Sequence, residues 1–156
     1  MTTDHLLKAL RKRHKPRFSY NAPDSIFVDE LRVGTGRSKS AYNSGAEQRI
    51  DAFFMHLLPS KRWHRISYEL KSSRSDFIAE LRNPAKRKYA LLYSNQFYFV
   101  APKGLLKVTE IPVEAGLIEV DDRLNARVLV EAPIRDTPEP SWRFVASIIR
   151  RLYMEI

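Results

Sequence analysis

The chain has 156 residues, 44% of them hydrophobic, so it can bury one sizeable core and we expect a single domain over residues 1–156. The absence of cysteine excludes disulfides, thiolate metal sites and thiol redox chemistry. No apolar run approaches the length of a membrane span, and the N-terminus lacks the apolar core of a signal peptide. We therefore expect a soluble, cytoplasmic protein with no membrane partner.

The net charge of +9 is unevenly distributed along the chain. Residues 110–139 contain eight acids and three arginines, a local balance of −5, so the rest of the chain carries +14. The cations gather in two groups: Lys8, Arg11, Lys12, Arg13, Lys15 and Arg17, and then Arg74, Arg82, Lys86, Arg87 and Lys88. Such clusters attract polyanions through counterion release, which favours a nucleic-acid partner. A solvated basic face without a partner is the alternative, and it is the stronger reading for the first group.

The first half of the chain predicts a helix followed by three strands. Thr3 and Asp4 can begin a basic helix over residues 3–14, which ends before Pro16. A strand is expected at residues 26–33, and the polar stretch that follows, residues 34–48, is expected to be a mobile loop that closes over nucleic acid. Strands at residues 49–58 and 64–71 are separated by the turn Pro59-Ser60-Lys61 and most simply form an antiparallel pair.

The second half predicts two short helices and three more strands before a last helix. Cap residues after Lys71 begin the first short helix, and Asn83-Pro84 begins a second one that runs through Tyr93. Residues 96–101 form an apolar run that is typical of a central strand covered on both faces. Shorter strands are expected at residues 116–120 and 127–132. The elements therefore predict an α/β domain with a central mixed β-sheet flanked by helices.

Ser141 is expected to cap the final helix, over residues 141–154. Its predicted apolar face consists of Trp142, Val145, Ile148, Ile149 and Leu152, which follow helical spacing.

The residues that indicate a catalytic site are Asp51 and the triplet Glu69-Leu70-Lys71. Their charged side chains interrupt otherwise apolar strands. Residues two apart in a strand share a face, so Glu69 and Lys71 project together. If the two strands pair, Asp51 joins Glu69 at a spacing that suits a hard divalent cation, and Lys71 can orient an attacking water or offset charge on a phosphate. This arrangement is typical of phosphodiester cleavage. The alternative is an incidental ion pair at a strand edge, because Glu-X-Lys triplets are common by chance.

The order of elements resembles the core of the PD-(D/E)XK nuclease-like superfamily, the restriction-endonuclease-like fold, over roughly residues 26–120. A longer string, Tyr68-Glu69-Leu70-Lys71-Ser72-Ser73-Arg74-Ser75-Asp76-Phe77, resembles the MmcB-type DNA-repair proteins and related phage-encoded proteins, as do residues 97–102 and 116–118. Residues 30–36 resemble the corresponding segment of archaeal Holliday-junction resolvases. The resemblance implies a protein of prokaryotic or phage origin.

Carried over to this sequence, the resemblance implies that Asp51 and Glu69 ligate Mg²⁺ or Mn²⁺, that the Leu70 carbonyl adds a third ligand, and that Lys71 is the catalytic lysine. Ile50 stands where the superfamily motif has proline, a position that shapes the strand and supplies no ligand. Families of this fold often add an acid from the first helix. Here Asp4 lies there, with Glu30 on the next strand as a substitute, and the choice between them is open.

The function expected from these residues is a Mg²⁺-dependent DNA endonuclease of repair, recombination or phage defence. Contacts to DNA are expected from the residues Arg37, Lys39, Arg49, Ser73, Arg74, Arg82, Lys86 and Lys88. The main alternative is a catalytically inactive DNA-binding module with the same fold, because a fold alone does not decide activity. An RNA-processing enzyme is a weaker alternative. The oligomeric state is open, a homodimer included.

Overall fold

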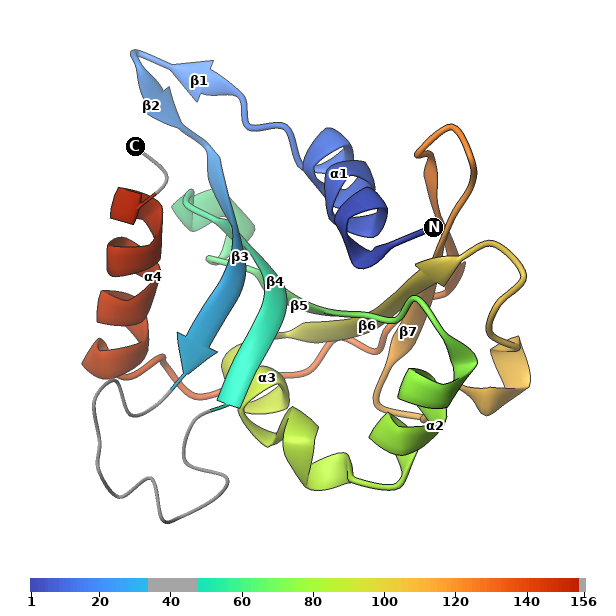
Figure 1. Cartoon of the computed structure of the whole chain (residues 1–156). Coiled ribbons are helices and arrows are strands. Elements are labelled where there is room, and N and C mark those ends of the chain that lie inside the picture. Colours follow the sequence, from blue (N-terminus) through green and yellow to red (C-terminus); the bar gives the residue numbers. More distant parts are fainter. Residues whose placement is uncertain (34–47, 155–156) are drawn as a thin grey trace.

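The computed structural model describes residues 1–33 and 48–154 as a six-stranded mixed sheet with helices on both faces (Figure 1). Its elements are α1 (Thr3–Arg13), β1 (Phe18–Ser19), β2 (Ala22–Pro23), β3 (Ser25–Val33), β4 (Gln48–His56), η2 (Pro59–Lys61), β5 (Arg65–Leu70), α2 (Arg74–Leu81), η3 (Pro84–Arg87), α3 (Lys88–Tyr93), β6 (Gln96–Pro102), η4 (Val108–Glu110), β7 (Gly116–Val120), β8 (Ala126–Val130) and α4 (Trp142–Met154). The prediction of an α/β fold with a central mixed sheet flanked by helices is confirmed.

Strand order in the sheet follows chain order, β3-β4-β5-β6-β7-β8. The first three strands pair antiparallel, β5, β6 and β7 pair parallel, and β8 returns antiparallel to β7. Parallel pairing of β5 with β6 requires a crossover, which α2, η3 and α3 supply. The predicted antiparallel pair of strands around Pro59 is confirmed, with η2 as its turn.

Two apolar clusters lie on the two faces of the sheet. On one face, α1 buries Leu6 and Leu10 against β-strand residues that include Tyr68 and Val100. On the other face, α2, α3 and α4 bury Phe77, Ala90 and Phe144 against Phe53, Phe97 and Phe99. The central strand β6 contributes to both clusters, as expected for a strand that is covered on both sides.

The strand β3 is irregular at Glu30, which has a left-handed backbone (φ 48°). Asp29 pairs with Ala52 and Leu31 pairs with Ile50, so the register does not shift, and one residue on each strand, Glu30 and Asp51, lies between these two pairs. The left-handed residue interrupts the alternation of side chains along β3, so that Leu31 and Val33 join the same apolar cluster as Val28. Asp29 and Glu30 lie outside that cluster.

The predicted apolar face of the last helix is partly wrong. Trp142 and Ile149 are 87% and 55% exposed, whereas Phe144 and Ile148 are buried. The helix turns Phe144 inward because its ring stacks on Tyr93 at 4.2 Å and meets Phe53 edge-on at 5.3 Å. Ser141 does cap this helix, since its hydroxyl accepts a hydrogen bond from the Phe144 N–H.

The hairpin of β1 and β2 was not predicted. The polar stretch expected to close over nucleic acid lies outside the described residues, apart from Gln48, which belongs to β4. Among the residues that the structure describes, no helix combines the length and apolar character needed to cross a membrane.

Candidate active site

The register of β4 and β5 brings Asp51 and Glu69 together. Ala52 pairs with Tyr68 and Phe53 with Ser67, so the next step of this antiparallel ladder sets Asp51 opposite Glu69. Asp51 turns one carboxylate oxygen, Oδ2, onto the backbone of β5, where it accepts a hydrogen bond of 2.9 Å from the Leu70 N–H. The aspartate is therefore fixed at the edge of β5, with its second oxygen left for another partner.

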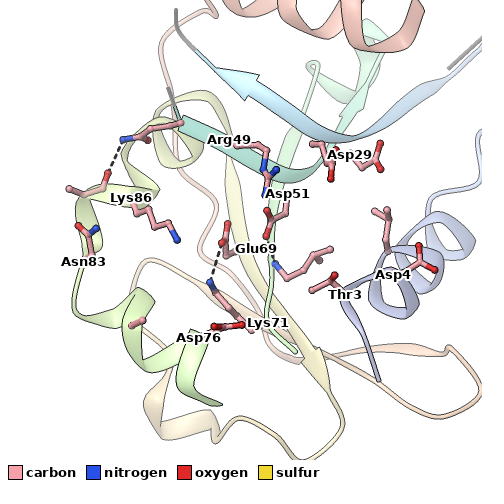
Figure 2. Close-up of a pocket in the computed structure, with 16 residues that line it drawn as sticks. Thr3, Asp4, Asp29, Arg49, Asp51, Glu69, Lys71, Asp76, Asn83 and Lys86 are labelled. Atoms are coloured by element: carbon pink, nitrogen blue, oxygen red, sulfur yellow. Dashed lines mark hydrogen bonds and ion pairs between the residues drawn. The ribbon is translucent and has the colours of Figure 1, made fainter. Parts of the chain in front are cut away.

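Lys71 follows directly after β5, and its backbone N–H continues the ladder to the Val100 carbonyl at 2.9 Å. This hydrogen bond keeps Lys71 aligned with the strand, so its side chain projects on the same face as Glu69. The ammonium lies 3.2 Å from Glu69 Oε1, and the residue is only 6% exposed. Figure 2 shows the Asp51, Glu69 and Lys71 side chains pointing toward one another at the centre of a pocket.

The surroundings of Glu69 favour its neutral form. Burial raises the pKa of the Glu69 carboxyl to about 8, and the charge of Asp51 adds to the effect, while Lys71 opposes it. Burial alone would lower the pKa of Lys71, but Glu69 and a second carboxylate, Glu80, outweigh burial and raise it. At neutral pH the pair therefore consists of a charged Lys71 ammonium and a Glu69 carboxyl that retains its proton.

An open cleft of about 940 Å³ surrounds these residues. Its lining comes from α1, β3, β4, β5, α2 and η3, and consists of Thr3, Asp4, Leu7, Asp29, Glu30, Gln48, Arg49, Asp51, Glu69, Leu70, Lys71, Asp76, Ala79, Asn83, Ala85 and Lys86. Six of these residues are acids and three are cations. Cations from outside the lining pair with two of these acids, Lys8 with Asp4 and both Arg11 and Arg151 with Asp29.

The two candidates for a third acidic ligand, Asp4 and Glu30, both line the cleft. Asp29 and Asp76 also line it, and neither was singled out in the sequence. Asp29 is engaged by arginines, at 3.2 Å from Arg11 and 2.5 Å from Arg151. Over residues 1–33 and 48–154, no three Asp, Glu or His side chains lie close enough together to form a metal-binding group. Asp51 and Glu69 are nevertheless close enough for the charge of Asp51 to raise the pKa of Glu69.

Of the cations expected to contact DNA, Arg49 and Lys86 line the cleft. Arg49 precedes Asp51 by two positions in β4, so the two side chains share a face of the strand. Lys86 belongs to η3, on the opposite side of the cleft from α1 (Figure 2). These two cations therefore share the cleft with the carboxylates of Asp51 and Glu69.

The remaining expected DNA contacts lie elsewhere. Arg74 forms a double hydrogen bond with the Glu110 carboxylate, at 2.6 and 3.1 Å, and does not line the cleft. Ser73 caps α2, because its hydroxyl accepts a hydrogen bond from the Asp76 N–H at 3.2 Å. Arg82 and Lys88 are exposed and also do not line the cleft. Arg37 and Lys39 lie outside the described residues.

Sequence reasoning missed Glu80 and placed Arg87 in the wrong environment. Glu80 is 2% exposed and lies 3.1 Å from the Lys71 ammonium. Arg87, grouped above with the cations expected to attract a polyanion, is 4% exposed and pairs with Glu80 at 3.1 Å. A signal was present, because Glu80 lies three residues after the core residue Phe77 and therefore shares its helical face.

The sequence matches no protein-family model and no curated protein. Among solved structures, the chain is similar to a protein of unknown function from Silicibacter pomeroyi, with a TM-score of 0.63 and 18% sequence identity. The similarity covers 99% of this chain and 86% of that one. At this level of identity the likeness shows a shared fold, the mixed α/β architecture described above, and nothing of activity.

Proposed function

We propose that the protein is a metal-dependent DNA endonuclease with a restriction-endonuclease-like core of the PD-(D/E)XK type. The observation that carries the proposal is the meeting of Asp51, Glu69 and Lys71 in one open cleft, with the two carboxylates in register on neighbouring strands. Carboxylates and an ammonium gathered in this way are the groups that phosphodiester hydrolysis with a divalent cation requires.

The donor set fits Mg²⁺ or Mn²⁺, because it consists of hard oxygen atoms. Asp51 and Glu69 would hold the ion through their carboxylates, and the Leu70 carbonyl is the third candidate ligand from the same strands. A bound ion of this kind supplies Lewis-acid activation of a water molecule and of the scissile phosphate.

The other side chains have separate tasks. The Leu70 N–H fixes Asp51 in one orientation. Lys71 remains charged beside Glu69, where it offsets negative charge that develops on the phosphate or orients the attacking water. Arg49 and Lys86, on the rim of the cleft, hold the nucleic-acid backbone in register with the reacting groups.

An inactive DNA-binding module is the competing function, and the charge of the cleft argues against it. Two of the six acids in the lining are paired with cations from outside it, Asp4 with Lys8 and Asp29 with Arg11 and Arg151, so the argument rests on the centre of the cleft. A surface that only binds a polyanion gains from cations and gains nothing from carboxylates beside its central lysine. The position of Asp51 and Glu69 next to Lys71 therefore favours catalysis over passive binding.

Cleavage of plasmid, single-stranded, flap and junction DNA, with RNA in parallel and with Mg²⁺ or Mn²⁺, tests the proposal. Lys71→Ala should slow single-turnover cleavage about 100-fold or more, while DNA affinity measured with Ca²⁺ changes only a few-fold. Lys88→Ala, outside the cleft, is the matched lysine control and should cleave at the wild-type rate. A wild-type protein that cleaves no substrate would refute the enzyme and leave the binding module. Cleavage of RNA alone would reassign the substrate.

A further inference from the structure

Lys71 has a second carboxylate partner that lies behind the cleft. The ammonium is 3.2 Å from Glu69 Oε1 and 3.1 Å from Glu80 Oε1. Glu69 lines the cleft, whereas Glu80, on the inner face of α2, does not, and its side chain is 1% exposed. The lysine is thus held between one carboxylate that faces the substrate and one that faces the protein interior.

Glu80 is itself held by Arg87 through two hydrogen bonds. The guanidinium Nη1 donates to Glu80 Oε2 at 3.1 Å and to the Glu80 carbonyl at 3.2 Å, while Nη2 donates to Glu114 Oε1 at 3.2 Å. The same guanidinium lies over the Phe99 ring, 5.7 Å from its centre. A chain of alternating charges therefore runs from Lys71 through Glu80 and Arg87 to Glu114, which is partly exposed, and the Glu69 carboxyl contacts the chain at its Lys71 end.

This chain of charges contributes little net stability to the fold. Removing charged groups from water is costly, and buried ion pairs are often matched or exceeded in stability by apolar residues of similar volume. Glu80 occupies the same helical face as Phe77, where an apolar side chain would join the core directly. A lysine side chain, by contrast, has four rotatable bonds and reaches a fixed position only when its ammonium is anchored.

We propose that Glu80 is a positioning residue that anchors the Lys71 ammonium at the floor of the cleft, with Arg87 fixing Glu80 in turn. Its effect on cleavage rests on the function proposed above, whereas the anchoring itself is a property of the folded chain. Glu69 cannot serve as the sole anchor, because a metal ion would compete for its carboxylate. Glu80 is shielded from that competition by its burial.

The anchor is tested first without reference to activity, by the hydrogen exchange of lysine ammonium groups in ¹⁵N-labelled protein, with the Lys71 signal assigned by its loss in Lys71→Ala. The wild type should show a slowly exchanging Lys71 ammonium. Glu80→Gln, which keeps the size of the side chain, should speed its exchange about ten-fold or more, while Glu114→Gln, at the outer end of the chain of charges, should leave it unchanged. A rapidly exchanging Lys71 in the wild type, or equal protection in Glu80→Gln, would overturn the anchor.

A double-mutant cycle then tests the catalytic consequence. Glu80→Gln should slow single-turnover cleavage about ten-fold or more with DNA affinity changed less than about two-fold, and Lys71→Ala with Glu80→Gln should be no slower than Lys71→Ala alone. Additive losses would show that Glu80 acts independently of Lys71 and would overturn the proposal.

A second variant separates loss of the anchor from loss of the fold. Glu80→Met combined with Arg87→Met removes both buried charges together, should unfold in one cooperative transition, and should lose the anchor as Glu80→Gln does. If this folded variant kept the Lys71 protection, the proposal would fail. If the wild type cleaves nothing, the proposed function fails, and the exchange of the Lys71 ammonium still decides for or against the anchor.

Discussion

Glu69→Gln is expected to make the metal-free protein more stable at pH 7 and to weaken its binding of a divalent cation. The reason is the environment of the carboxyl, whose side chain is 16% exposed and lies next to Asp51. Burial, with the charge of Asp51, raises the pKa of Glu69 from its ordinary 4.5 to about 8 in the folded chain. Glutamine has the shape of the neutral carboxyl and carries no charge to desolvate.

The size of the effect follows from proton linkage. Between pH 4.5 and 8 the unfolded chain releases a proton that the folded chain retains. The free energy of unfolding therefore falls by about 1.4 kcal/mol for each pH unit. Compared with a chain in which the pKa of Glu69 is unshifted, the wild type is less stable by about 1 kcal/mol at pH 5. This deficit in the free energy of unfolding reaches about 3 kcal/mol at pH 7. Because Lys71 keeps Glu80 as its partner in the variant, we expect Glu69→Gln to recover most of this deficit.

Urea unfolding of both proteins with a chelator at pH 5, 7 and 8 measures the effect. The stability advantage of Glu69→Gln should grow with pH, and added Mg²⁺ should stabilise only the wild type. Glu110→Gln is a control of opposite sign, because hydrogen bonds from Arg74 lower the pKa of the partly exposed Glu110 to about 2. That pair contributes stability above pH 4.5 and loses it as the pH falls. An advantage for Glu69→Gln that is absent at pH 7, or equal at pH 5 and 7, would refute the reasoning.

Three further outcomes are expected. Asp51→Asn should weaken Mn²⁺ binding about ten-fold or more in calorimetric titrations without unfolding the chain, because its Oδ1 can still accept the Leu70 N–H; unchanged affinity would remove Asp51 from the site. Lys86→Ala should weaken DNA binding and flatten the salt dependence by about one unit, whereas Lys88→Ala, outside the cleft, should change both less; equal effects would show that the cleft does not direct binding. Burial lowers the pKa of His14 to about 3, so only the unfolded chain takes up a proton at this residue as the pH falls from 6.5 to 5. In urea unfolding, the free energy of unfolding of the wild type should therefore fall by about 2 kcal/mol over this range, and that of His14→Gln should not. Equal losses in the two proteins would contradict the burial of a neutral imidazole.

The sequence predicts the order of the elements and the central pair of the site because both depend on local rules. Alternation in a strand sets the faces of Glu69 and Lys71, and the turn at Pro59 sets the antiparallel pair that opposes Asp51 to Glu69. These inferences need no knowledge of how distant parts of the chain pack.

The residues that were missed depend on tertiary packing. Whether Glu80 faces solvent or the interior is decided by the way α2 lies on the sheet, and the same holds for the exposed Trp142 on α4. In the sequence, Arg74 resembles a residue that contacts DNA. In the folded chain η4 places Glu110 beside it, and this long-range pair could not be predicted from local patterns. The left-handed backbone of Glu30 could not be predicted for a further reason, since no glycine marks the position.

The agreement between strand order and chain order has a consequence for how this chain assembles the centre of its cleft. The carboxylates, the lysine and its buried anchor all lie between residues 51 and 87, on two consecutive strands and the helical crossover that follows them. Only short loops must close to bring these groups together, so their assembly costs little chain entropy. The centre is therefore a contiguous block of sequence, which recombination could transfer whole, while α1 and the segment from β7 to α4 could diverge around it.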